Sequence, residues 1–316
     1  MSGEGEGEVP LGPGREFDAI RLMLDRWGTR ARGIGDDAAV LDVPPGASLI
    51  ASVDASIDGR HFRRDWLTPR EIGYRAVAAA LSDLAAMAAR PLGVLIALGI
   101  PDGCREALAE IADGIGEAVD VVSTPILGGN VSGAAELSIV TTVLGEARAT
   151  LKRSAALPGD RVYVTGRLGG PGAAIAAWAA GREPAPAHRA RFAHPVPRMR
   201  EALWLAEHGA RAAIDVSDGL AADVGHLAAA SNVAIEIVLE HVPRMDGIDP
   251  RPAVASGEEY ELVVTAPEPM DVVAFETSFG LPLTDIGRVS AGNAETLLTE
   301  GGARVAIPRG YDHFSS

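Results

Sequence analysis

The sequence predicts an α+β fold built from two halves that meet near residue 149. Segments with helical periodicity alternate with short apolar segments of strand length, but too loosely for a regular doubly wound sheet. Between residues 147 and 160, Ser, Pro and Gly interrupt this pattern and mark a boundary. The 316 residues are enough for two domains of ordinary size.

The first half follows a tail at residues 1–14, which is rich in Gly, Glu and Pro and is predicted to be disordered. The tail lacks the apolar core of a signal peptide. Thr68 and Pro69 show the N-cap and N1 pattern that begins a helix. The expected elements are a helix over 16–27, strands over 38–41 and 48–53, a helix from 69 to about 89, a strand over 92–98, a helix over 106–119 and a strand over 137–144.

The second half repeats the mixture of short strands and helices, with one Pro-, Arg- and His-rich segment that we expect to be an irregular loop. Its expected elements are a strand over 161–165, a helix over 170–180, the loop over 181–196, a helix over 197–207, a strand over 212–215, a helix over 220–230, and strands over 234–239, 260–265 and 285–289.

The net charge of −15, from 43 acidic and 28 basic side chains, disfavours nucleic acid and anionic lipid as partners. Phosphates can still bind such a chain if metal ions separate the two sets of negative charge. Cys104 is the only cysteine, which excludes an intrachain disulfide and a four-cysteine zinc site. The apolar stretch 76–100 contains Asp83, Arg90 and Pro91, so we expect a helix and a strand rather than a membrane span. The expected location is the cytoplasm.

Four short motifs place carboxylates beside glycines or at the ends of predicted elements, namely GDDA at 35–38, SVD at 52–54, LSD at 81–83 and DVSDG at 215–219. Carboxylate oxygens are ligands of Mg²⁺, although each motif alone is compatible with a helix cap or a turn. Asp83 is the most informative, because it interrupts an apolar helical stretch and a buried unpaired carboxylate costs several kcal/mol. A bound metal ion is the simplest compensation.

Standard phosphate and nucleophile motifs are missing from the sequence. The glycine-rich segment 128–133 lacks the lysine of a Walker loop, and 166–172 lacks the spacing of a dinucleotide fingerprint. Both are compatible with simple turns. A Gly-x-Ser-x-Gly elbow does not occur either.

Taken in order, these and other motifs resemble those of the thiamine-monophosphate kinases, within the superfamily of aminoimidazole ribonucleotide synthetase and selenophosphate synthetase. The resemblance covers nearly the whole chain after the tail. The matching segments are FDAI (17–20), GIGDDAA (33–39), DGRHF (58–62), IGYRA (72–76), LSDLAAM (81–87), RS (153–154), PGD (158–160), IDVSDGL (214–220), GEEYEL (257–262) and GYDHF (310–314).

The resemblance implies a two-domain aminoimidazole ribonucleotide synthetase-like α+β fold. Residues 15–148 would form an N-terminal α/β domain with a mixed sheet, which binds ATP and Mg²⁺ and makes a homodimer, and 149–316 a C-terminal α+β domain. It also implies that ATP lies in a cleft between them and passes its γ-phosphoryl group to thiamine monophosphate. Transfer would be direct and in line, without a phosphoenzyme, and assisted by several Mg²⁺ ions. Such transfer needs charge neutralisation and alignment rather than a strong base.

Site residues are implied by position in the matching motifs, and none of them is a covalent catalyst. Asp37, Asp83 and Asp215 would organise the transfer. Metal ligands would be Asp37, Ser52, Asp54, Asp83, Asn130, Asp215 and Asp218. Nucleotide contacts would come from Gly129, Arg153 and Ser217, and substrate contacts from His61, Glu258 and Tyr311.

The chain departs from the family pattern at several positions. Asn130 stands where the family usually has Asp, and Pro308 where it often has an aromatic residue, which makes Tyr311 the substitute candidate for stacking on the substrate. Val53 replaces a hydroxyl residue, and Ser256 and Glu259 replace Gly and Asp.

Two alternatives stay open. One is another ATP-using enzyme of the superfamily, although a selenophosphate synthetase needs a reactive Cys or selenocysteine, and a hydrogenase-maturation homologue a terminal Cys, whereas Cys104 is internal. The other is a nucleotide-binding paralogue without turnover.

Overall fold

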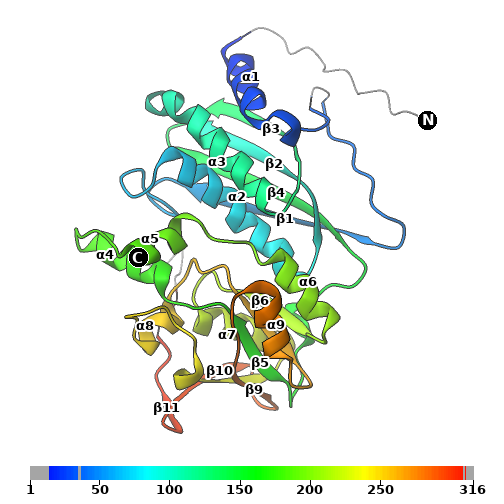
Figure 1. The fold of residues 1–316 in the computed structure, drawn as a ribbon, viewed down its shortest axis with the longest axis vertical. Helices are drawn as coiled ribbons and strands as arrows, with labels where there is room; N and C mark the ends of the chain where they lie inside the picture. Colours follow the sequence, from blue (N-terminus) through cyan, green and yellow to red (C-terminus); the bar gives the residue numbers. More distant parts are fainter. Residues whose placement is uncertain (1–13, 35–36, 309, 311–316) are drawn as a thin grey trace. The chain divides into compact units, whose positions relative to one another are not determined.

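The structure is a computed structural model that describes residues 14–34, 37–308 and 310 (Figure 1). The chain divides into two compact units. The N-terminal unit comprises residues 1–84 and 90–148, and the C-terminal unit comprises residues 85–89 and 149–316. The predicted tail up to residue 13 and the stacking candidate Tyr311 lie outside the described residues. In the part of the chain that is described, no helix is both long and apolar enough to cross a bilayer.

The N-terminal unit contains a four-stranded mixed sheet with the strand order β1-β4-β2-β3. Strand β4 pairs antiparallel with β1 and β2, and β2 pairs parallel with β3. The described elements are α1 Arg15–Trp27, η1 Gly28–Arg30, β1 Ser48–Ile57, α2 Pro69–Ala86, β2 Arg90–Ile100, η2 Asp102–Ala107, α3 Leu108–Val121, β3 Ile126–Gly133 and β4 Ser138–Ala147.

Helices α2 and α3 lie together against one face of this sheet (Figure 1). Residues of β4 alternate between buried and half-buried, and a Cβ added at the buried Gly145 would lie 3.1 Å from Leu84 of α2. The opposite face exposes apolar side chains of β1, because Leu49 is 52% exposed and Val53 is 63% exposed. The two faces of β1 therefore have different surroundings, which follows from the period of two along a strand.

The start of α2 confirms the predicted cap. Thr68 N donates to Glu71 Oε2 at 2.8 Å, and Glu71 N donates to Thr68 Oγ1 at 3.3 Å. This reciprocal pair is a capping box, in which two amides at the helix start find side-chain acceptors. The helix ends at Ala86, three residues before the predicted end.

The C-terminal unit contains a seven-stranded sheet with the order β11-β10-β7-β9-β5-β8-β6, in which only β10 and β7 are parallel. The apolar face of α7 packs into the core beside β6 and β7. The described elements are η3 Arg153–Ala155, β5 Arg161–Thr165, α4 Gly170–Ala179, α5 Pro186–Ala193, α6 Met199–Glu207, β6 Ala212–Asp215, α7 Leu220–Ser231, β7 Ala234–Val238, η4 Leu239–His241, α8 Pro250–Ala255, β8 Leu262–Ala266, α9 Val272–Phe279, β9 Leu283–Ser290, β10 Glu295–Glu300 and β11 Ala303–Val305.

Two sequence predictions were wrong. Residues 38–41 do not form a strand, and Val40 is 92% exposed, because this short apolar run has no partner strand to pair with in the described structure. The predicted loop over 181–196 contains helix α5, which begins at Pro186 and buries Phe192 and Ala193. Burial of these two side chains outweighs the loop-like composition of the segment.

The glycine-rich segment 128–133 is a strand rather than a turn. It belongs to β3, which lies parallel to β2 with Gly129 opposite Ile96. A Cβ added at Gly129 would overlap the carbonyl oxygen of Ile96, so the close approach of the two strands requires glycine there.

Candidate functional site

Strand β1 carries two of the expected metal ligands on one face. Ser52 and Asp54 are two residues apart and so point to the same side of the strand. Ser52 Oγ donates to Asp83 Oδ2 of α2 at 2.5 Å, which identifies this side as the helix-covered face. Asp54 Oδ1 accepts from Ala55 N at 2.7 Å. The structure thus places Ser52 and Asp54 on the helix-covered face of β1 and joins Ser52 to Asp83 of α2.

Asp83 is half-buried rather than fully buried. Its neighbour Ser82 is completely buried, so of these two residues only Asp83 is accessible to solvent. Asp83 therefore lies within helix α2, as the sequence predicted, and its carboxylate accepts a hydrogen bond from Ser52. A hydroxyl and two carboxylates are oxygen ligands of the kind that Mg²⁺ takes.

The edge strand β3 lines two separate cavities. One, of about 430 Å³, is lined by Gly129 together with Asp37, Leu95 and Leu144. Asp37 is exposed and reaches this cavity from the irregular segment after α1. The structure therefore brings the expected ligand Asp37 to the same cavity as the expected nucleotide contact Gly129.

The second cavity, of about 560 Å³, lies between α1, the start of α3 and β3. Leu22, Leu108 and Val131 give it apolar walls, and Asn130 is an exposed polar residue at its edge. Because Asn130 follows Gly129 in a strand, the two residues face opposite sides. Arg15, Glu16, Asp18 and Arg105 also line the cavity, and this mixture of apolar and polar side chains suits a flat heterocycle with polar edges.

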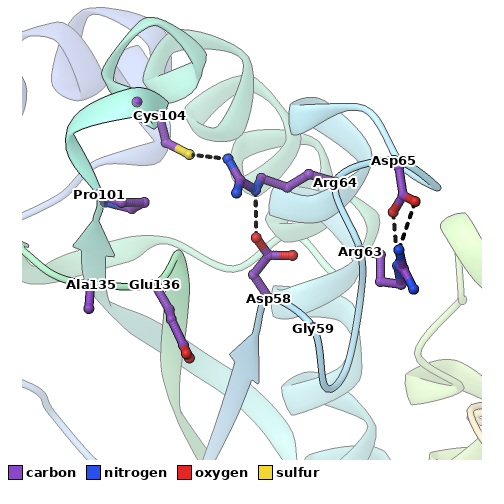
Figure 2. A pocket seen from close by; sticks show the side chains of 10 residues that line it. Asp58, Gly59, Arg63, Arg64, Asp65, Pro101, Cys104, Ala135 and Glu136 are labelled. Atoms are coloured by element: carbon purple, nitrogen blue, oxygen red, sulfur yellow. Dashed lines mark hydrogen bonds and ion pairs between the residues drawn. The ribbon is translucent and has the colours of Figure 1, made fainter.

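His61 lies in the turn after β1. Ile57 N donates to His61 Nδ1 at 3.1 Å, so a neutral ring carries its proton on Nε2, from which it can donate to a ligand. Figure 2 shows the neighbouring cavity of about 680 Å³, where Arg64 lies between Asp58 and Cys104. Arg64 donates to Asp58 Oδ2 at 2.5 Å and to Cys104 Sγ at 2.9 Å, so its charge is compensated within the protein.

In the C-terminal unit, residues 216–219 connect β6 to α7 and are held by a side chain that sequence reasoning missed. The carboxylate of Asp223 accepts from Ser217 N at 3.0 Å and from Asp218 N and Gly219 N at 3.1 Å. Asp223 is 2% exposed. Burial, followed by the nearby charges of Asp215 and Asp218, raises its pKa to about 8.

A sequence signal for Asp223 did exist. An acidic residue in the first turn of a helix that follows an Asp-Gly loop is well placed to accept from the free amides of that loop. Asp215 ends β6 and is 4% exposed. Asp218, Asp223 and His226 have potential ligand atoms within 4.8 Å of one another, so this end of α7 is a place where a cation can be held.

A second loop, residues 257–260, is bonded to the first. Glu258 N donates to Ser217 O at 2.7 Å, and Tyr260 N donates to Val216 O at 2.9 Å. A Cβ added at Gly257 would lie 2.6 Å from Ser217 O, so this approach also requires glycine. The expected nucleotide contact Ser217 and the expected substrate contact Glu258 are therefore neighbours.

The two departures Ser256 and Glu259 contact each other. Ser256 Oγ donates to Glu259 Oε1 at 2.6 Å, and Gly169 N donates to the same oxygen at 2.5 Å. Glu259 is completely buried, and its Oε2 has no hydrogen-bond partner among the described residues, although Arg191 lies 3.8 Å away. Burial raises the pKa of Glu259 to about 7, against the opposing effect of Arg191.

Arg153 lies apart from these loops within its unit. Its carbonyl accepts from Ser231 Oγ at 2.6 Å, at the C-terminal end of α7, whereas Ser217 precedes the N-terminal end. The helix has 12 residues and separates the two points by about 17 Å. The Arg153 residue is exposed.

Comparison with known proteins gives matches over both units. The family model described as AIR synthase related protein, N-terminal domain, matches residues 35–147, and the one described as AIR synthase related protein, C-terminal domain, matches residues 158–300. A thiamine-monophosphate kinase of Salmonella typhimurium is 34% identical, with 95% of this chain and 98% of the relative covered. One of Pyrococcus horikoshii is also 34% identical, with 95% and 96% covered.

Solved structures agree. A thiamine-monophosphate kinase from Stenotrophomonas maltophilia K279a has a TM-score of 0.79 and 31% identity, covering 90% of this chain and 97% of its own. A structure described as AaThiL complexed with AMPPCP and TMP has a TM-score of 0.75 and 29% identity, covering 95% and 97%. A hydrogenase maturation protein, HypE, at 20% identity and a TM-score of 0.77, shares the fold. The predicted two-domain α+β fold is confirmed.

Proposed function

The chain belongs to the thiamine-monophosphate kinase family, and we propose that it transfers the γ-phosphoryl group of ATP to thiamine monophosphate, forming thiamine diphosphate and ADP. The observation that carries the proposal is the match to these kinases over 95% of the chain, with nearly complete coverage of the relative. A related structure holds AMPPCP, an ATP analogue, together with TMP.

We propose Mg²⁺ as the cofactor. The donor set fits this ion, because Ser52, Asp54 and Asp83 offer hard oxygen ligands on one face of β1 and α2. When bound, the ions neutralise phosphate charge and align the reacting oxygens for in-line transfer. The proposed ligands are Asp37, Ser52, Asp54, Asp83 and Asn130 in the domain 15–148, and Asp215 and Asp218 in the domain 149–316. Asp37, Asp83 and Asp215 would organise the transfer.

For the nucleotide, we propose that the base enters the cavity of about 560 Å³ and packs against its apolar side chains Leu22, Leu108 and Val131. The backbone of Gly129, on the adjacent strand position, can approach a phosphate closely because no side chain intervenes. Ser217 would bind a phosphate oxygen through a loop whose shape Asp223 fixes. The exposed guanidinium of Arg153 would supply a further phosphate contact.

For the acceptor, His61 would donate from Nε2, and the Glu258 carboxylate would accept from the amino group of the pyrimidine ring. Thiamine also carries a cationic thiazolium ring, and a carboxylate complements that charge. Tyr311 stays a proposal for ring stacking, since it lies outside the described residues.

We also propose a cytoplasmic homodimer. The open face of the N-terminal sheet presents Leu49 and Val53, and a second copy can cover this face with the same patch by twofold symmetry. Val53→Lys should shift the protein to monomers in sedimentation velocity. Val273→Lys is the matched control, since Val273 is 70% exposed in the other unit. A monomeric wild type, or equal dissociation of both variants, would rule out this interface.

The direct test is ADP formation by the purified full chain in a coupled assay. We expect turnover that needs both Mg²⁺ and thiamine monophosphate, and loss of turnover when EDTA removes the metal. Absence of turnover across a range of Mg²⁺ concentrations would reject the proposal.

A second candidate function is ATP binding without turnover, which the uncharged Asn130 favours. It predicts ATP binding by calorimetry with no acceptor-dependent ADP, and recovery of ADP formation in Asn130→Asp.

A further inference from the structure

We infer that Tyr260 is a positioning residue for the phosphoryl acceptor, acting through the carboxylate of Glu258. This inference rests on the proposed function, because it takes Glu258 as an acceptor contact. Tyr260 Oη donates to Glu258 Oε2 at 2.7 Å, and Tyr260 is 8% exposed while Glu258 is half-buried.

The backbone of this loop is strained on both sides of Glu259. Glu258 has φ 63° and Tyr260 has φ 53°, and these are two of the five non-glycine residues with positive φ in the described chain. Such conformations are unfavourable for residues with a Cβ and persist where surrounding contacts hold them, often at binding sites. Two of the five lie in one three-residue segment, and one of them is the predicted acceptor contact Glu258.

Identified contacts hold the strained loop on both sides. Its backbone amides at Glu258 and Tyr260 donate to Ser217 O and Val216 O. Between them, the side chain of Glu259 points inward and is bonded to Ser256 Oγ and Gly169 N. Because Glu259 is anchored in the interior, Glu258 and Tyr260 cannot relax their backbone without breaking that anchor.

As a consequence, the hydrogen bond from Tyr260 orients the side chain of Glu258 before a ligand binds. A free glutamate side chain loses rotamer entropy when a ligand immobilises it. The phenol hydroxyl already holds Oε2, and a carboxylate has further lone pairs with which to accept from a ligand. An acceptor that binds this carboxylate therefore meets a group whose direction is set, which favours affinity.

The test is Tyr260→Phe, which keeps the ring and removes only the hydroxyl. We expect KM for thiamine monophosphate to rise about tenfold, as for loss of a hydrogen bond to a charged group. KM for ATP should stay within about twofold, since the bonds that hold Ser217 use the backbone. The matched control is Tyr163→Phe, which removes a buried hydroxyl bonded to Met270 N elsewhere in the unit and should leave both KM values unchanged.

A double-mutant cycle with Glu258→Ala, which removes the acceptor of the Tyr260 hydrogen bond, separates positioning from a general structural role. If Tyr260 acts through Glu258, the double variant should resemble Glu258→Ala alone. Additive effects, equal changes in both KM values, or an unchanged KM for thiamine monophosphate would overturn the inference. Loss of thermal stability by Tyr260→Phe together with loss of both affinities would do the same.

Calorimetric titration of wild type and Tyr260→Phe with thiamine monophosphate keeps this inference distinct from the kinase assignment. Weaker binding by the variant, with no turnover in wild type, would support the positioning role and reject the kinase. Turnover in wild type with unchanged binding by the variant would reject the positioning role alone. Absence of acceptor binding by wild type would reject both.

Discussion

Most candidate residues of the N-terminal unit lie on regular elements, namely Ser52, Asp54, Asp83, Gly129 and Asn130, whereas Ser217, Asp218 and Glu258 of the C-terminal unit lie in loops. Ser52 and Asp54 share one face of β1 because a strand alternates its side chains, and Ser52 bonds to Asp83 because α2 lies across that face. Ser217 N donates to the carboxylate of Asp223, and Glu258 N donates to Ser217 O, beside Glu259, which is itself anchored to Ser256 and Gly169. Neither Asp223 nor Glu259 was an expected site residue.

This difference determines how each unit should respond to mutation. In the N-terminal unit, backbone pairing maintains the positions of the site residues, so replacing a ligand side chain there should affect the chemistry and leave the fold intact, whereas a change that disturbs the pairing itself, as at Gly129, should cost stability. In the C-terminal unit, removing a distant anchor should displace a site residue that was not itself changed. Four predictions, from the largest expected effect to the smallest, follow from this contrast.

Asp83→Asn should lower kcat/KM by about 1000-fold, since it removes a charge from the proposed Mg²⁺ ligands. The melting temperature should stay close to that of wild type, because Asn can still accept from Ser52. Steady-state ADP release and a thermal scan check both parts. Asp102→Asn, at a side chain 99% exposed in the same unit, is the control and should be inert. Near-normal activity of Asp83→Asn would remove Asp83 from the site.

Glu259 should give the C-terminal unit a pH-dependent stability. Its pKa is raised to about 7 in the folded state, mainly by burial and despite Arg191, while Glu261 adds a smaller raising effect. The folded state therefore holds a proton that the unfolded chain releases near pH 4.5. This contribution is fully present below that pH and is lost as pH rises through 7, amounting to at most about 3 kcal/mol.

Urea unfolding between pH 4.5 and 8 measures this effect. Glu259→Gln is the matched variant, because Gln mimics the protonated acid at every pH. The part of the pH dependence centred near pH 7 should disappear in it, leaving the part that comes from Asp223, whose pKa is raised to about 8. If wild type and Glu259→Gln lose the same stability near pH 7, a group other than Glu259 is responsible for the pH dependence.

Asp223→Ala should lower kcat/KM by about 100-fold, although Asp223 is not a proposed contact. Three loop amides lose their acceptor, and the loop that carries Ser217 and Asp218 is no longer held. The fully exposed Asp246 in the same unit provides the control, Asp246→Ala. Equal, small effects of both variants would show that loop 216–219 keeps its shape without the Asp223 carboxylate. That result would contradict the proposed difference between the two units.

Gly129→Ala should destabilise the N-terminal unit by about 2 kcal/mol, since the added methyl group overlaps Ile96 O and forces β3 away from β2. Gly133→Ala lies on the same strand with open space around its Cβ and should change stability by less than about 0.5 kcal/mol. Urea unfolding of the two variants measures the difference. Equal stabilities would mean that β3 can shift without cost.

The contrast also explains what could be predicted from sequence. Strand β1 and helix α2 were predictable, because alternation and the Thr68 cap are local signals. The C-terminal loops were only partly predictable. The role of Glu259 depends on Gly169 and Ser256, and nothing in a run of consecutive residues shows that a glutamate will meet an amide 90 positions away. The irregular segment 38–41 and helix α5 were mispredicted because local apolar content and turn-like composition do not show which neighbours a segment will pack against.

The most direct test of the account is a crystal structure of the full chain with AMPPCP, thiamine monophosphate and Mn²⁺ in place of Mg²⁺, with metal ions located by anomalous scattering. We expect Mn²⁺ peaks in contact with carboxylate oxygens of Asp83 and of Asp215, at about 2.2 Å. Peaks confined to Asp218, Asp223 and His226, or no peak at either Asp83 or Asp215, would contradict the proposed metal-assisted transfer.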